Sequence, residues 1–256
     1  MANDHKNPLG MVPDPYDGST FVLPKTHCTQ ERKIWFRRAN EIFGFQLVAE
    51  LALKECKNRY GNILSEKGLK PDTPFKIASS DGRSVMLPAR KLLFLCDDGI
   101  NVLYRQIFIM FYGSFETYMF DILGRSFGEI KETDNILEKS VNIMMRGNWD
   151  GKLCKMNSKF SIGYKAGELE DHFKGYEMEF EGNKYFNPLA FLDELAQVRH
   201  KIIHASSVIE DGRFIFINSE IFNSYYGYFA HLTDYIDRLF SDKFGYERLV
   251  INPGEA

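Results

Sequence analysis

The chain has 256 residues, of which 44% are hydrophobic and 26% charged, a balance that is typical of a folded globular protein. The formal net charge is −3, from 32 Lys and Arg against 35 Asp and Glu, so no overall positive field draws this protein to nucleic acid. Any contact with phosphates therefore needs a local cluster of cations. The four cysteines form no Cys-x-x-Cys pair, which argues against a zinc ribbon, a redox motif or a disulfide framework.

The sequence predicts neither a signal peptide nor a membrane-spanning segment. Residues 1–24 are polar and rich in Pro and Gly, without an apolar core region. The longest strongly apolar uncharged stretch, residues 106–115, is about half of the roughly 20 residues that cross a bilayer. We therefore expect a cytoplasmic protein with no membrane partner, whose cysteines are buried and reduced.

Residues 1–88 predict an irregular segment followed by a helix and a hairpin that pack on the core. Four prolines interrupt residues 1–28, where no apolar period is visible. A helical period begins after Thr29 and extends to about Cys56, and Gly61 is a stop signal. Asp81-Gly82 lies between two short β-prone runs, which predicts a β-hairpin over residues 75–87.

Residues 89–240 predict the main helical domain. A helix over residues 89–96 should be broken or kinked at Asp97-Asp98-Gly99, and a central helix should follow from about residue 100 to 127. This central helix is apolar on nearly all sides, as buried helices are. A shorter helix is expected from Asp134 to Arg146, with Gly147 at its end.

The later part of the domain predicts an insertion and two further helices. Residues 148–187 are charged, Gly-rich and interspersed with aromatic residues, so we expect a long loop with little regular structure. Asn187 and Pro188 suit the cap and first position of a helix that ends near Ala205. A second Asp-Gly hairpin is expected at 208–217, then a helix capped by Ser219 and a tail over 241–256. The predicted fold class is mainly α, a helical bundle with two short β-hairpins.

The helix that begins at Pro188 carries the concentrated chemical signal of the chain, the segment Arg199-His200-Lys201-Ile202-Ile203-His204. Arg199 and His204 are five residues apart, about 140° around a helix with 3.6 residues per turn. They therefore do not share a face, although both can line a cleft along an exposed helix. His200 and His204 are four residues apart and do share one face.

This segment resembles the Arg-x4-His motif of the HEPN superfamily, in which a polar residue often follows the arginine. The run Ser114-Phe115-Glu116-Thr117-Tyr118 resembles the other core helix of that family, and the resemblance covers roughly residues 89–240. It implies a HEPN-like helical bundle that forms a homodimer and brings two motifs together across a two-fold axis. Many members are metal-independent endoribonucleases, including toxins and antiviral defence proteins.

The resemblance also implies roles for single residues. Arg199 would bind the phosphate, His204 would be the acid or base, His200 would be an auxiliary group and Glu116 would orient Arg199. The expected partners are an RNA substrate, a second copy of the chain and an antitoxin or defence-system protein, and no cofactor or metal is implied. Some family toxins carry a tyrosine two residues after the histidine, where this chain has Ser206, so modification by that route is not expected.

The residue chemistry agrees with this interpretation. Cleavage of RNA without metal needs a base for the 2′-hydroxyl, an acid for the leaving 5′-oxygen and a cation for the phosphate. Histidine titrates near pH 6.5 and can serve as acid or base. The planar guanidinium of arginine matches phosphate oxygens. A dimer would supply two copies of His204 and Arg199, enough for both proton transfers.

Other interpretations remain open. Arg199 and His204 can be structural, through an ion pair with Glu116 or Glu194 and a histidine at a helix end. A metal held by His200 and His204 would need a third ligand. The cations proposed to contact RNA are Lys152, Lys155, Lys159 and Lys201. The first three, with Lys165, can instead belong to a solvated loop.

A non-catalytic dimerisation or binding module is the alternative function. It would sense a protein or a nucleotide, with residues 148–187 as its contact surface. The expected hairpin at 208–217 would offer a free strand edge to a partner.

Overall fold

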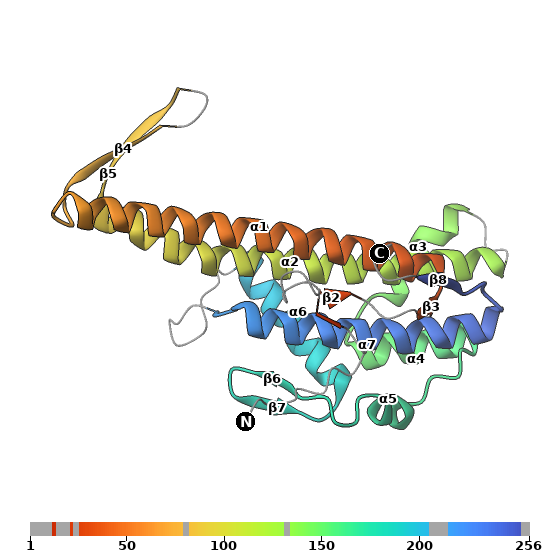
Figure 1. Ribbon diagram of the computed structural model, residues 1–256. Helices are drawn as coiled ribbons and strands as arrows, with labels where there is room; N and C mark the ends of the chain where they lie inside the picture. Colours follow the sequence, from red (N-terminus) through yellow and green to blue (C-terminus); the bar gives the residue numbers. More distant parts are fainter. Residues whose placement is uncertain are drawn as a thin grey trace.

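The computed structural model confirms the mainly α class. Helices make up most of the described chain, and its strands occur in short antiparallel pairs. Helices α1, Gln30–Glu66, and α2, Ala89–Glu129, span most of the length of the molecule, and α7, Ser219–Phe244, lies alongside their right-hand part (Figure 1). The structure describes residues 12–13, 21–22, 26–78, 82–130, 134–204 and 215–251.

Two long helices form the backbone of the fold. Helix α1, Gln30–Glu66, begins at Thr29, whose hydroxyl accepts a hydrogen bond from the Arg32 amide at 3.3 Å. Helix α2, Ala89–Glu129, runs back alongside α1 in the opposite direction (Figure 1). Both helices are longer than the sequence pattern predicts, and Gly61 does not end α1.

The predicted break at Asp97-Asp98-Gly99 is wrong, because α2 continues through it without interruption. The carboxylate of Asp97 accepts from the Lys57 ammonium at 2.7 Å. A Cβ on Gly99 would lie 3.4 Å from a methyl group of Leu53. Asp97 and Gly99 therefore belong to the contact between α1 and α2, where tertiary packing outweighs the weak helix propensity of this triplet.

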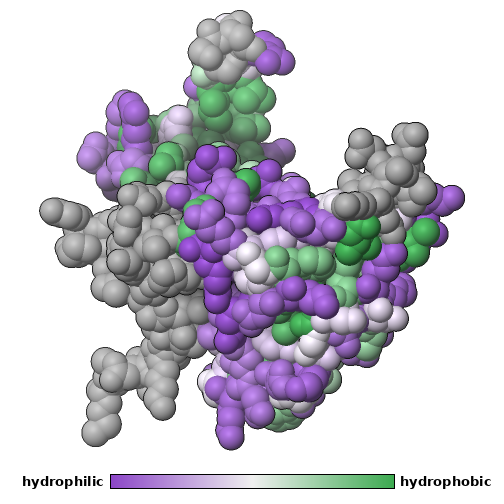
Figure 2. Space-filling view, turned by 90° about the vertical axis from the view of Figure 1, so that its right-hand side faces the viewer, coloured by the Kyte–Doolittle hydropathy of each residue, from purple (hydrophilic) through white to green (hydrophobic). Residues whose placement is uncertain are grey.

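The predicted hairpin over 75–87 is confirmed, but it does not pack on the core. Strand β4, Pro74–Ala78, pairs antiparallel with β5, Ser84–Pro88, and the pair projects from the far end of α1 and α2 (Figure 1). Hydrophobic side chains gather on this projection (Figure 2), and Val85 and Met86 are 50% and 57% exposed. We call this end of the molecule, residues 48–78 and 82–102, the arm.

Helix α7, Ser219–Phe244, completes the core against α1 and α2. The centre of the Phe229 ring lies 5.4 Å from that of Phe111 and 5.0 Å from that of Phe115. Trp35 contributes a buried side chain to the same core from α1. The cap of α7 is Asn218 rather than the predicted Ser219, since its side-chain oxygen accepts from the amide of Ile221 at 2.9 Å.

The expectation of a long irregular loop at 148–187 is wrong. After α3, Asp134–Met144, the chain forms α4, Trp149–Phe160, and α5, Ala166–His172. A small hairpin follows, β6, Met178–Phe180, paired with β7, Asn183–Tyr185. The aromatic residues that resembled a loop are core residues, and they include the buried side chains of Trp149, Phe160, Tyr164, Phe173 and Phe180.

The segment directly before α1 pairs with the end of the described chain. Strand β8, Leu249–Ile251, pairs antiparallel with β3, Thr26–Cys28, and β1, Val12–Pro13, pairs with β2, Phe21–Val22. Most of the hairpin predicted at 208–217 lies outside the described residues, and residues 215–218 form no strand. Across the described helices, none is both long and apolar enough to cross a membrane.

Candidate functional site

Helix α6, Pro188–His204, presents the Arg-x4-His segment as predicted. The side-chain oxygen of Asn187 accepts from the amides of Leu189 at 2.9 Å and Ala190 at 3.0 Å, which confirms Asn187 as the cap. The apolar face of the helix packs against α2 and α4 and contains Leu192, Leu195, Val198 and Ile202. This burial fixes the rotation of α6 about its axis, so that Arg199 faces α2 and His204 is exposed.

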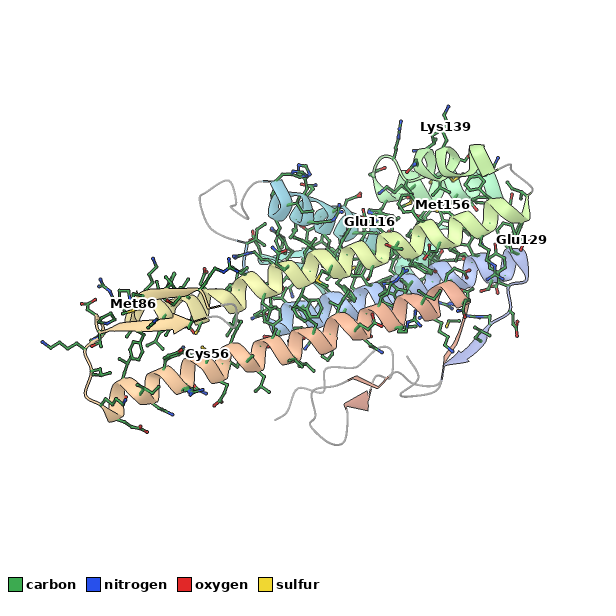
Figure 3. The ribbon with its side chains drawn as sticks, turned by 90° about the horizontal axis from the view of Figure 1, so that it is seen from above. Cys56, Met86, Glu116, Glu129, Lys139 and Met156 are labelled. Atoms are coloured by element: carbon green, nitrogen blue, oxygen red, sulfur yellow. The ribbon has the colours of Figure 1, made fainter. Side chains whose placement is uncertain are left out.

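Arg199 forms an ion pair with Glu116, the acidic residue that sequence analysis assigned to it. Arg199 Nη2 lies 3.2 Å from Glu116 Oε2, and the side chains are 35% and 29% exposed. Glu116 lies in the middle of α2, on the side where α6 crosses (Figure 3). The guanidinium carbon is also 5.6 Å from the centre of the Tyr112 ring, so it rests beside an aromatic face. Two side chains from α2 thus hold the guanidinium in one place.

A hydrogen-bonded support lies behind this pair, and sequence analysis missed it. The Trp149 indole donates to the Tyr112 hydroxyl at 3.2 Å, and the Trp149 amide donates to Asp193 Oδ1 at 2.9 Å. The start of α4 is therefore tied to both α2 and α6. Asn148 caps α4, and Asp150 follows in its first turn, a helix-start signal that could have revealed this element.

The charges near Arg199 are partly withdrawn from water. Burial raises the pKa of Glu116, while the Arg199 and Lys152 cations act to lower it. Burial lowers the pKa of Lys152, and the carboxylates of Glu116 and Asp193 oppose that change. The Lys152 ammonium lies 3.7 Å from the centre of the Trp149 ring. Two cations and two carboxylates therefore alternate around the contact between α2, α4 and α6.

The two histidines of the segment lie together at the exposed end of α6. The ring centres of His200 and His204 are 4.6 Å apart, and both side chains are exposed. His200 also lines a shallow open depression of about 480 Å³, whereas Arg199 and His204 are not part of its lining. The structure thus pairs Arg199 with Glu116 and His204 with His200, in two different surroundings. The depression is lined by Asn148, Asp193, Ala196, Gln197, His200 and Lys201.

The lysines proposed to contact RNA do not form one strip. Lys152 is buried, and its ammonium lies over the Trp149 ring. The exposed Lys155 donates to the Arg146 carbonyl oxygen at 2.7 Å, and the Lys159 ammonium lies 5.6 Å from the centre of the Phe127 ring. Lys201 lines the depression beside His200. Lys201 is therefore the member of this set that belongs to the Arg-x4-His segment itself.

No metal-binding arrangement is found in the described part of the chain, where no three His, Cys, Asp or Glu side chains gather. His172 lies on α5 and faces α7. Its Nδ1 is 2.8 Å from Arg238 Nη2, and its Nε2 is 3.1 Å from the carbonyl oxygen of His231. His172 is thus engaged in the packing of α5 on α7.

Comparison with protein-family models, with curated proteins and with solved structures gave no match. The resemblance to the HEPN superfamily therefore depends on the segment in α6, its partner segment in α2 and the order of the helices. Ser206 and most of the hairpin expected at 208–217 lie outside the described residues.

Proposed function

We propose that this protein is a metal-independent endoribonuclease of the HEPN type, acting in the cytoplasm as a toxin or antiviral defence effector. The observation that carries the proposal is the fixed guanidinium of Arg199, held by Glu116 beside Tyr112 and still one third exposed. The same helix presents two exposed histidines, His200 directly after Arg199 and His204 about one turn beyond it. A phosphate-binding cation and two imidazoles, side chains that can act as acid or base, thus share one short segment.

The proposed reaction needs no group from outside the protein. One histidine takes the proton of the ribose 2′-hydroxyl, whose oxygen attacks the adjacent phosphorus. A second histidine gives a proton to the leaving 5′-oxygen, so the products carry a 2′,3′-cyclic phosphate and a 5′-hydroxyl. Arg199 stabilises the charge that develops on the phosphate oxygens, where charge-assisted hydrogen bonds are strongest.

We propose that the site is completed by a second copy of the chain. Arg199 faces α2 and His204 faces solvent, so a single α6 presents them in different directions. A two-fold axis near the exposed end of α6 would bring two copies of His204 and two of Arg199 to one phosphate. Each copy of His204 would then perform one of the two proton transfers.

The test is cleavage of total RNA by the purified protein in excess chelator. We expect the wild type to leave 2′,3′-cyclic phosphate ends, and Arg199→Ala and His204→Ala each to lose at least about 10²-fold in rate. Arg37→Ala removes an exposed cation from α1 and serves as the control with unchanged rate. Light scattering and circular dichroism would establish that the variants remain folded dimers. Equal cleavage by His204→Ala would overturn the proposal.

The second candidate is a non-catalytic binding module that recognises a protein partner, and the arm favours it. Large apolar side chains on both arm helices are open to solvent, among them Val48, Leu51 and Phe94 at 65–70% exposure. Exposed apolar surface of this kind marks sites of protein contact. This candidate predicts that no RNA is cleaved in any assay and that Leu51→Glu releases the partner. Residues 148–187 are no longer its contact surface, because they contribute to the core.

A further inference from the structure

Two cysteines from different helices lie in contact within the arm. Cys56 on α1 and Cys96 on α2 place their sulfur atoms 3.7 Å apart, although 40 residues separate them in the chain. Cys56 lies in the half of α1 nearer the projecting hairpin (Figure 3). Cys96 is buried, whereas Cys56 is half-buried and accessible to a small reagent.

Contacts between neighbouring residues hold the two thiols opposite each other along the paired helices α1 and α2. Lys57, next to Cys56, forms an ion pair at 2.7 Å with Asp97, next to Cys96. One turn along α1, Leu53 lies against Gly99, where an added Cβ would stand 3.4 Å from a Leu53 methyl group. A polar contact and an apolar contact therefore support the register of α1 against α2 beside the thiol pair.

We propose that Cys56 and Cys96 are a redox modification site, which forms a reversible disulfide between the two helices of the arm. A disulfide has a sulfur–sulfur distance of about 2.0 Å, so the two sulfurs must approach by less than 2 Å from their present contact. Rotation of the two side chains supplies this movement without a change in the helix register. Disulfides of this kind in reducing compartments are transient and respond to the redox state.

The oxidant is a low-molecular-weight disulfide such as oxidised glutathione. The Cys56 thiolate attacks one sulfur of the glutathione disulfide, and one glutathione leaves as a thiolate that takes up a proton. The Cys96 thiolate then attacks the Cys56 sulfur of the mixed disulfide and releases the second glutathione. Two protein thiols are oxidised, one glutathione disulfide is reduced to two thiols, and the two protons pass from protein to glutathione.

The order of these steps follows from exposure. Cys56 is the sulfur that a reagent reaches first, because Cys96 is covered by the surrounding arm. Burial, with the neighbouring Cys56, raises the pKa of Cys96 to about 11, so Cys96 is the slower group to act as a nucleophile. Cys96 is therefore the resolving cysteine, and the mixed disulfide at Cys56 is the intermediate.

Peptide mapping of the wild-type protein tests the site directly. The native full chain is incubated with oxidised glutathione, its remaining thiols are alkylated, and it is digested with trypsin without reduction. Cleavage after Lys and Arg places Cys56 in the peptide 55–57 and Cys96 in the peptide 92–105, and neither peptide contains another cysteine. We expect these two peptides to be linked in the monomer, with the loss of two hydrogen atoms, and to separate after reduction.

The variants distinguish the order of attack. Cys96→Ser should accumulate the mixed disulfide at Cys56, and Cys56→Ser should leave Cys96 as a free thiol. Cys28→Ser and Cys154→Ser should both keep the linked peptides, since these cysteines lie elsewhere in the fold. Wild-type protein that carries only glutathione adducts or free thiols at Cys56 would overturn the proposal, as would a link between two chains. The result does not depend on the proposed ribonuclease activity.

Discussion

The indole nitrogen of Trp149 and the hydroxyl oxygen of Tyr112 lie 3.2 Å apart, so the first turn of α4 supports the aromatic ring on which Arg199 rests. Trp149 is also almost fully buried against Phe115, with ring centres 5.2 Å apart. One side chain thus connects the stability of the core to the geometry of the candidate site.

Trp149→Ala should therefore strongly destabilise the protein. We expect the free energy of unfolding to fall by about 3–5 kcal/mol, from lost burial and the cavity left behind. Trp149→Phe keeps a ring but loses the donor to Tyr112, and we expect a fall of about 1–2 kcal/mol. Urea unfolding followed by circular dichroism measures both. A change below about 0.5 kcal/mol in Trp149→Ala would contradict a core position for α4.

Glu116→Gln should weaken cleavage without unfolding the protein. The amide keeps a hydrogen-bond acceptor for Arg199 but removes the charge, so we expect a rate about tenfold lower, equivalent to ~1.4 kcal/mol. Glu194→Gln is the matched control, because Glu194 lies on α6 and interacts with Tyr185 instead.

The pH profile separates this positioning role from a purely structural one. Burial raises the pKa of Glu116, so in the wild type this carboxylate takes up a proton, and releases Arg199, at a higher pH than an exposed glutamate would. Activity should therefore decline on the acid side as pH falls through that raised pKa. The Gln variant should lack this acid limb; an identical limb in both proteins would assign it to another group.

The buried His231 should make the folded protein less stable in mild acid. Burial lowers its pKa from 6.5 to about 4, with further repulsion from His172 and the nearby Arg32 and Arg238, while Asp234 opposes the change. Between those two pH values the unfolded chain binds a proton that the folded chain does not. The free energy of unfolding should thus fall by about 3 kcal/mol as pH drops from 6.5 to 4.

His231→Phe tests this assignment. Both ring nitrogens of His231 are buried, and neither has a hydrogen-bond partner among the described residues. Phenylalanine keeps the ring that packs against Phe173 and Tyr176 and removes two unsatisfied polar atoms. We expect higher stability at pH 7, by about 1 kcal/mol, and a flatter decline below pH 6.5. The exposed His204 serves as the control, since His204→Asn should leave the decline unchanged.

Asn187→Ala should loosen the start of α6. The side chain accepts hydrogen bonds from two backbone amides, so its loss should lower the free energy of unfolding by about 1 kcal/mol. Asn187→Ser keeps an acceptor at the cap and should retain most of the stability. Thermal melts of the two variants in parallel would measure the difference, and equal melting temperatures would show that the cap does not stabilise α6.

Local signals in the sequence were sufficient to predict α6 and the hairpin expected around Asp81-Gly82. Asn187-Pro188 is a strong helix start, and the apolar period that follows leaves one possible rotation for the helix. The pairing of Arg199 with Glu116 was expected from the resemblance to the HEPN superfamily, whereas the residues alone left Glu116 and Glu194 as alternative partners.

The errors have a common cause in tertiary packing. Asp97-Asp98-Gly99 is a poor helical triplet, but Gly99 gains a close helix contact and Asp97 an ion pair, neither of which is visible in a local window. Residues 148–187 form short elements whose apolar period is interrupted every few residues, so their buried aromatic side chains resembled a surface loop. The burial of Lys152 was missed for the same reason, because α4, which carries it, was expected to be part of a loop.

The contact between Thr29 and Asp237 has a consequence for the order in which the protein folds. Thr29 caps the first turn of α1, and its own amide and hydroxyl are held by a carboxylate 208 residues further along the chain. Helices α1 and α2 can pair as a local hairpin early in synthesis, whereas this contact must wait until α7 has emerged from the ribosome. The first turn of α1 is therefore fixed late in folding. Until then the nascent chain exposes the aromatic side chains that α7 will cover.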